Sequence, residues 1–116
     1  MDIESLREYC LKKQDVSEGF PFNESTLVFK VAGKMFALVD IDAYDSINLK
    51  CDPELAMELR ERYDAVTAGF HMNKKHWNTI LFDGSIPDKL LREWIDHSYL
   101  EVVKGLPKKE REKLGF

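Results

Sequence analysis

The chain opens with apolar residues that are spaced as on one face of a helix. Ile3, Leu6 and Cys10 form this stripe, and Asp2 precedes it at a position where a carboxylate can cap the helix. The stretch 15–23 then breaks the period with a Gly and a Pro, and we expect Phe20-Pro21-Phe22 to form an ordered loop whose rings cover an edge of the core.

A strand pattern begins at residue 26. The runs 26–31 and 35–39 are rich in β-branched and aromatic residues, and Gly33 between them can take positive φ in a tight hairpin turn. The alternating run 46–50 predicts a third strand, which completes an antiparallel meander. Two further strands, which would form a second hairpin, are expected over 65–70 and 77–82.

Helix signals separate and follow these strands. Asp52-Pro53 is a strong helix start, because the carboxylate can cap and Pro is favoured in the first turn. The stretch 85–88 resembles a capping box for a long helix that ends at Gly105, and Pro107 can open a short last helix. The order α-βββ-α-ββ-α-α predicts one α+β domain over residues 1–116, with an antiparallel sheet (a three-stranded meander plus a hairpin) packed with helices.

Composition agrees with a single globular unit. The chain has 116 residues, of which 44% are hydrophobic, and no apolar run approaches the length of a membrane span. The acidic start does not resemble a secretory signal, so we expect a cytoplasmic protein with no membrane association. The two cysteines, Cys10 and Cys51, lie among apolar neighbours and are expected to be reduced, buried side chains.

The formal charge of −4 argues weakly against nucleic acid as a partner, because DNA binding depends on Lys and Arg. The charge is unevenly distributed, however. Residues 1–64 carry 8 basic and 14 acidic side chains, so 8 − 14 = −6, whereas residues 65–116 carry 9 and 7, so 9 − 7 = +2. Basic groups therefore concentrate toward the end of the chain.

The segment 71–78, His-Met-Asn-Lys-Lys-His-Trp-Asn, contains no acidic residue. Its Lys, His and Asn side chains can donate to phosphate oxygens, and Trp77 offers a flat ring for stacking. A solvated turn with Trp77 buried in the core explains the same residues equally well. A second basic cluster, 104–113, is typical of a solvated terminal helix, and it can also add to a positive surface.

Metal and catalytic sites are not expected. His71 and His76 would need further ligands, and the nearest candidates, Asp83 and Cys51, are not at a recognisable spacing. Neither a nucleophile elbow nor a phosphate-binding glycine loop is present. We interpret His97, in the last long helix, as a packed or surface residue, and we expect no cofactor.

Several segments together resemble the YjbR/MmcQ family. They run in order over about residues 15–110 and comprise Phe20-Pro21-Phe22, 29–36, 49–53, 71–78, 94–99 and 106–109. The resemblance implies a compact α+β fold that has been compared with secretion chaperones and frataxin-like domains, and it brings no catalytic activity. Family members are labelled DNA-binding proteins because of a double-wing arrangement of hairpins. Here the wings would be the Lys30–Lys34 hairpin and the segment around Lys74 and Lys75.

Three classes of function follow from these observations. The leading hypothesis is a non-enzymatic module that binds double-stranded DNA. The alternative is a protein- or peptide-binding module that uses a sheet edge or the Trp77 region, and an enzyme or small-molecule binder is the least favoured class. The residues expected to contact nucleic acid are Lys34, His71, Asn73, Lys74, Lys75, His76, Trp77, Lys108 and Lys109. The oligomeric state is left open.

Overall fold

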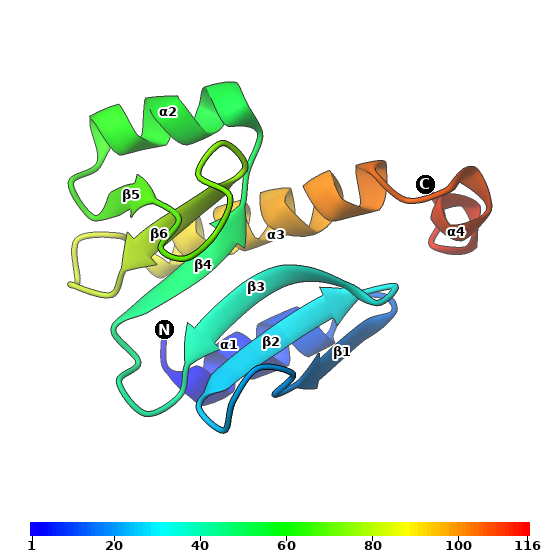
Figure 1. Cartoon of the computed structure of the whole chain (residues 1–116), viewed down its shortest axis with the longest axis horizontal. Helices are drawn as coiled ribbons and strands as arrows, with labels where there is room; N and C mark the ends of the chain where they lie inside the picture. Colours follow the sequence, from blue (N-terminus) through cyan, green and yellow to red (C-terminus); the bar gives the residue numbers. More distant parts are fainter.

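Six strands and four helices make up the chain, which a computed structural model describes over all residues 1–116. Figure 1 shows their arrangement. The helices are α1 (Ile3–Leu11), α2 (Pro53–Arg62), α3 (Asp88–Lys104) and α4 (Lys108–Lys113). The strands are β1 (Val16–Gly19), β2 (Thr26–Val31), β3 (Lys34–Asp40), β4 (Ser46–Lys50), β5 (Val66–Ala68) and β6 (Trp77–Leu81).

The strands form one antiparallel sheet in the order β1-β2-β3-β4-β6-β5. The predicted meander is β2-β3-β4, and the predicted second hairpin is β5-β6, which joins the meander through the β4–β6 pair. The α+β class and the predicted order are confirmed, and the structure adds β1 within the stretch 15–23. This edge strand has only four residues, one of them a glycine, so its alternation is too short to stand out in the sequence.

One face of the sheet packs against α1, α2 and α3 and carries the main core. Figure 1 shows α1 and α3 behind the sheet and α2 along β5 at its edge. Strand residues alternate between faces, so Leu27, Phe29, Ile47 and Ile80 all point toward the helices. Phe36 is fully buried there, and its ring meets that of Tyr99 from α3 edge-on at 5.6 Å. None of the four helices combines the length and the hydrophobicity needed to cross a membrane.

The predicted caps of the first two helices are present. The Asp2 carboxylate accepts a hydrogen bond from the Ser5 backbone N–H at 2.8 Å, and Asp52 accepts from the N–H groups of Glu54 and Leu55 at 3.2 Å each. Each carboxylate satisfies N–H groups that have no partner within the helix, and each lies near the positive end of the helix dipole.

The capping box predicted at the start of α3 is wrong. Pro87 occupies the N-cap position, and no side chain caps the helix. The Ser85 hydroxyl and backbone N–H instead donate to the Asp83 carboxylate, at 2.5 and 2.9 Å. A local turn therefore uses the groups that would have capped the helix, as short polar side chains often do.

The hairpin between β2 and β3 has the predicted two-residue turn. Gly33 has φ of 78°, and Ala32 has φ of 49°. A turn with positive φ at both central residues has a twist that matches that of the paired strands. This conformation strains the Ala32 backbone, because only glycine enters the positive-φ region freely. The register of the pair shifts between Phe29 and Lys30, where a bulge places Phe36 in the core.

The Ser98 hydroxyl of α3 continues the sheet where the β3–β4 ladder ends. It donates to the Phe36 carbonyl at 2.5 Å and accepts from the Lys50 N–H at 2.9 Å. The ladder stops at the neighbouring pair, Ala37 and Leu49, so the fully buried hydroxyl satisfies both backbone groups at this position.

Candidate binding face

The opposite face of the sheet carries no helix, and Figure 1 looks onto it with α1 and α3 behind. We call it the helix-free face. Strand alternation and the register bring polar and apolar side chains together there. Its strand residues are Ser17, Gly19, Thr26, Val28, Lys30, Met35, Leu38, Asp40, Ser46, Asn48, Lys50, Thr67, Trp77, Thr79 and Leu81.

Trp77 lies at the centre of this face and is buried. Its residue exposure is 8%, and it packs with Val28 and Leu38 in a small cluster separate from the main core. Met35 and Met72 pack against the same cluster. Of the two interpretations open for Trp77, the structure supports the buried ring, since a stacking platform must be accessible.

The loop between β5 and β6 folds over the helix-free face because two contacts hold its start. The Gly69 N–H donates to the Trp77 carbonyl at 2.8 Å, and the Phe70 N–H donates to the Thr79 hydroxyl at 2.9 Å. A Cβ at position 69 would lie 2.7 Å from the Cβ of Trp77, so only glycine fits this approach.

Arg60 of α2 holds the other end of the same loop. Its guanidinium donates to the Asn78 side chain at 2.7 Å, to the Trp77 carbonyl at 3.1 Å and to the Lys74 carbonyl. Asn78 is buried and also donates to the Ala56 carbonyl at 3.3 Å. The loop is therefore held at this end by the Arg60 side chain of α2.

Five lysines gather at one end of the sheet, which we call the basic end. Lys30 and Lys50 belong to the helix-free face, and Lys74 and Lys75 lie in the loop that folds over it. Lys34 pairs with Val31 of the main core, so it stands at the same end on the other face. Antiparallel topology places the β2–β3 turn, the end of β4 and the β5–β6 loop at this same end. The width from β2 to β6 is three strand spacings, about 14 Å. None of these lysines takes part in any of the five ion pairs of the molecule. The five are Lys30, Lys34, Lys50, Lys74 and Lys75.

The opposite end is acidic. The loops that follow β1, β3 and β6 meet there, and the residues 20–25, 41–45 and 82–87 include no Lys or Arg. The carboxylates of this acidic end are Glu24, Asp40, Asp42, Asp45 and Asp83, none of which is in an ion pair. Hydrogen bonds from the Ser85 hydroxyl and backbone N–H lower the pKa of Asp83, so this carboxylate remains charged well into the acid range.

A groove runs along the helix-free face from the acidic end to the β5–β6 loop. We call it the aromatic groove because two exposed rings border it, Phe22 at 61% exposure and Phe70 at 68%. Its volume is about 760 Å³. The Thr79 hydroxyl donates to the Asn48 amide oxygen at 2.5 Å across its floor. The charged or titratable residues of its lining are Asp40, Asp45 and His71.

A family model described as YjbR matches residues 11–101, which is most of the chain. The chain belongs to the YjbR family. The predicted resemblance is thereby confirmed. Relatives of similar length include the uncharacterized protein YjbR of Escherichia coli K12, 34% identical over 115 residues, and the uncharacterized protein YbdF of Escherichia coli O157:H7, 35% identical over 119 residues. Each alignment covers 98% of both chains.

Solved structures support the same YjbR-family fold. The crystal structure of Deinococcus radiodurans protein DR2400, with a DUF419 domain, matches with a TM-score of 0.90 and 43% identity. The match covers 99% of this chain and 88% of that one. A solution structure from Pseudomonas syringae matches with a TM-score of 0.70 and 28% identity, over 87% of this chain and 92% of that one.

The structure brings only some of the predicted YjbR-family contact residues together. Lys34, Lys74 and Lys75 all lie at the basic end, whereas His71 lines the aromatic groove with its ring 4.0 Å from that of Phe70. The Lys74 ammonium donates to the Gly69 carbonyl at 3.1 Å, so it also helps to shape the loop.

Two other residues of the predicted set organise the loop itself. The Asn73 amide oxygen accepts from the Lys75 N–H at 3.0 Å, and the Asn73 carbonyl accepts from the His76 N–H at 3.2 Å. The His76 carbonyl in turn accepts from the Cys51 N–H at 2.7 Å. These contacts leave the exposed Asn73 side chain and the half-buried His76 ring beside the lysines.

The lysines of α4 stand apart from this segment. Figure 1 shows α4 beyond the end of α3, away from the β5–β6 loop. Lys108 lies 3.9 Å from Glu112, and the tip of the β2–β3 hairpin and α4 enclose a cavity of about 320 Å³ lined by Glu110 and Lys113. The hairpin tip therefore adjoins α4, and among the predicted contact residues Lys34 is the nearest to that tip in sequence.

Two lysines of the basic end, Lys30 and Lys50, were not among the residues predicted from the sequence. Both occupy polar positions within strands whose apolar and polar residues alternate, and this alternation was the sequence signal that could have identified them. Their convergence depends on the bulge in β2–β3 and on the β4–β6 pairing, and neither can be read from the sequence alone.

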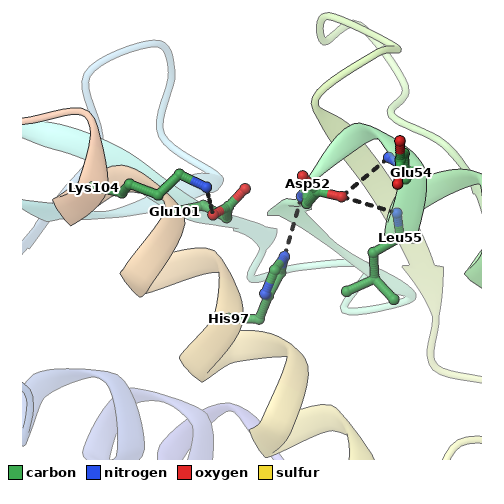
Figure 2. A network of polar contacts seen from close by, with 6 residues as sticks. All are labelled: Asp52, Glu54, Leu55, His97, Glu101 and Lys104. Atoms are coloured by element: carbon green, nitrogen blue, oxygen red, sulfur yellow. Dashed lines mark hydrogen bonds and ion pairs between the residues drawn. The ribbon is translucent and has the colours of Figure 1, made fainter.

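His97 has a structural role, as predicted for a packed residue (Figure 2). Its Nε2 accepts from the Asp52 backbone N–H at 3.1 Å, which ties α3 to the start of α2. Farther along α3, Lys104 donates to Glu101 at 3.0 Å. Because Nε2 is occupied as an acceptor, His97 is not arranged as a free general base.

Both cysteines are buried and unpaired with each other, as predicted. Burial raises the pKa of Cys10 and of Cys51 to about 12, so each stays a neutral thiol at physiological pH. No group of three or more His, Cys, Asp or Glu side chains is close enough to hold a metal ion.

Proposed function

We propose that this YjbR-family chain is a non-enzymatic protein that binds double-stranded DNA through the basic end of its sheet. The observation that carries the proposal is the convergence of five lysines that have no carboxylate partner. Flexible ammonium groups spread over about 14 Å suit several successive phosphates of a duplex. The label attached to the family supports the same choice of ligand.

Local charge explains how an acidic protein can present such a surface. Carboxylates lie on the margin of the basic end, since Asp52 caps α2 and Asp15 and Glu110 line the cavity between the hairpin tip and α4. The remaining negative charge lies largely on the helices and at the acidic end. Repulsion from the acidic end would orient a duplex across the basic end.

The basic end lacks the guanidinium groups that most often read guanine, since it contains lysines, Asn73 and His76 but no arginine, and the Trp77 ring is buried. Lysines provide charge without the planar, two-point geometry by which Arg reads guanine. We therefore propose contacts to the phosphate backbone with little sequence preference.

A titration of labelled duplex DNA at several salt concentrations tests this function. If all five lysines neutralise phosphates, the slope of log affinity against log salt should be about −4.5. Lys34→Glu and Lys75→Glu should each weaken binding and flatten the slope. Lys89→Glu, which makes the same charge change on an exposed residue of α3, is the matched control. An absence of binding at low salt, or an equal loss in the control, would refute the proposal.

The α4 lysines are tested separately. If the duplex extends past the β2–β3 hairpin, the double variant Lys108→Glu with Lys109→Glu should also flatten the salt slope. If binding stays unchanged, the contact surface ends at the hairpin.

A further inference from the structure

The aromatic groove presents large apolar side chains to solvent beside the carboxylates of Asp40 and Asp45. Phe22 and Phe70 are more than half exposed, and Leu81, which also lines the groove, is 41% exposed. Soluble proteins seldom leave aromatic rings grouped around a concavity without a partner. The predicted protein-binding region, Trp77, is covered by Met72, so the accessible apolar surface lies in the groove beside it.

The form of the groove favours an extended segment. It is open to solvent and is lined by strands and loops from the β1–β2 turn to the β5–β6 loop. Its floor carries hydroxyl and amide groups of Asn48, Thr67 and Thr79, which can exchange hydrogen bonds with the main chain of a bound segment. Apolar rings at the borders and polar groups along the floor resemble the division between anchor pockets and main-chain contacts in peptide recognition.

The charge of the groove lining favours a peptide segment with basic residues. Asp40 and Asp45 belong to the lining, and no Lys or Arg does. Asp42 and Glu24 stand on the adjoining loops, so a cation at this end meets several unpaired carboxylates. An acidic or phosphorylated ligand would be repelled at the same place.

We propose that the aromatic groove binds an extended peptide segment of a partner protein that carries an aromatic or large aliphatic anchor followed by Lys or Arg residues. The anchor lies between Phe22 and Phe70, and the basic residues lie against Asp40 and Asp45. This activity does not depend on DNA binding, because the groove lining includes none of the five lysines of the basic end.

The test begins with selection from a random peptide library on the purified full chain. The expected result is enrichment of peptides with an apolar anchor next to Lys or Arg. A synthetic peptide of the enriched sequence, labelled with fluorescein, then gives affinities by anisotropy. Phe70→Ser and Asp45→Lys should each weaken binding roughly tenfold, as expected for the loss of an aromatic anchor or of a close charge contact.

Matched controls lie elsewhere on the surface. Phe116→Ser removes a ring that is 56% exposed outside the groove, and Asp64→Lys makes the same charge change beyond α2. Lys75→Glu separates the two proposals, because it should weaken DNA binding and leave peptide affinity unchanged. Circular dichroism confirms that each variant is folded.

Several results would overturn the proposal. These are enrichment of no motif, enrichment of acidic peptides, or equal losses in the control variants. Sedimentation could also reveal a dimer that Phe70→Ser dissolves, and the occupant of the groove would then be a second copy of this chain.

Discussion

The two faces of the sheet use charged residues in opposite ways. All five ion pairs of the molecule have at least one partner in a helix, on the side where the core lies. The basic end of the sheet has five lysines and the acidic end has five carboxylates, and none of these forms an ion pair. Charges that stabilise the native chain are thus separated from charges that remain available to a partner.

The apolar residues show the same separation. The main core contains 23 buried residues on the helix-covered face, whereas the buried cluster on the helix-free face contains three. Stability should therefore depend on the first face and binding on the second. Substitutions on one face that alter stability and binding equally would contradict this division.

The largest expected effect is on the helix-covered face. Phe36→Ala removes a fully buried ring and should lower the free energy of unfolding by about 3 to 5 kcal/mol, because a cavity remains between β3 and α3. Urea denaturation monitored by circular dichroism measures the change. Met57→Ala, which truncates a side chain that is mostly exposed on α2, is the control and should have little effect. Similar losses in the two variants would contradict the assignment of the core.

A smaller loss of unfolding free energy is expected at Ser98, where α3 contacts the backbones of β3 and β4. Ser98→Ala should cost about 1 to 3 kcal/mol, since it leaves the Phe36 carbonyl and the Lys50 N–H without a partner in a buried place. Thermal and urea unfolding would measure it. Ser46→Ala, at the outer end of β4, should change stability by less than about 0.5 kcal/mol. If Ser98→Ala leaves the free energy of unfolding unchanged, the backbone groups of β3 and β4 pair directly with each other once the hydroxyl is absent.

Alkaline pH should weaken the helix-covered face specifically. Burial raises the pKa of Cys10 and Cys51 to about 12, and it raises those of Tyr9 and Tyr44 to about 12 as well. In the unfolded chain these groups lose protons at lower pH, so the native state binds more protons and stability falls as pH rises above the unfolded values. The urea midpoint should therefore decline steadily above about pH 9. A midpoint that stays constant up to about pH 11 would disprove this.

The smallest effect on stability is expected in the aromatic groove. Phe22→Ala combined with Phe70→Ala should change the free energy of unfolding by less than about 0.5 kcal/mol, because both rings are mostly exposed in the free protein. The same unfolding experiments test this. A loss of several kcal/mol would mean that the rings support the fold, and the contrast between the two faces would fail.

Local signals predicted most of the fold. Asp2, Asp52 and Pro53 mark helix starts, and Gly33 marks a turn, through interactions within a few residues of each position. The α3 start was predicted wrongly, because Asp83 competes for Ser85, and the sequence does not rank two short-range partners for one hydroxyl.

The candidate site was less predictable, since it is assembled by long-range pairing. The loop lysines Lys74 and Lys75 attract notice in the sequence because no acidic residue is near them. Lys30 and Lys50 join them only through the sheet register, and Phe22 reaches the groove opposite Phe70 from a distant loop. Burial of Trp77 likewise depends on Val28 and Leu38, from strands far away in sequence.

The strand order also has a consequence for how the chain reaches its native state. The strands β1 to β3 each pair with the next strand in the chain, whereas β4 pairs with β6 across the intervening α2 and β5. Contacts between distant segments require a larger loss of chain entropy, so we expect the meander to form early and the β4–β6 pair to form late. Pulse-labelled hydrogen exchange during refolding should protect amides of β2 and β3 before those of β6. Until β6 arrives, β4 is an open edge, and a newly made chain would be most prone to aggregation in that interval.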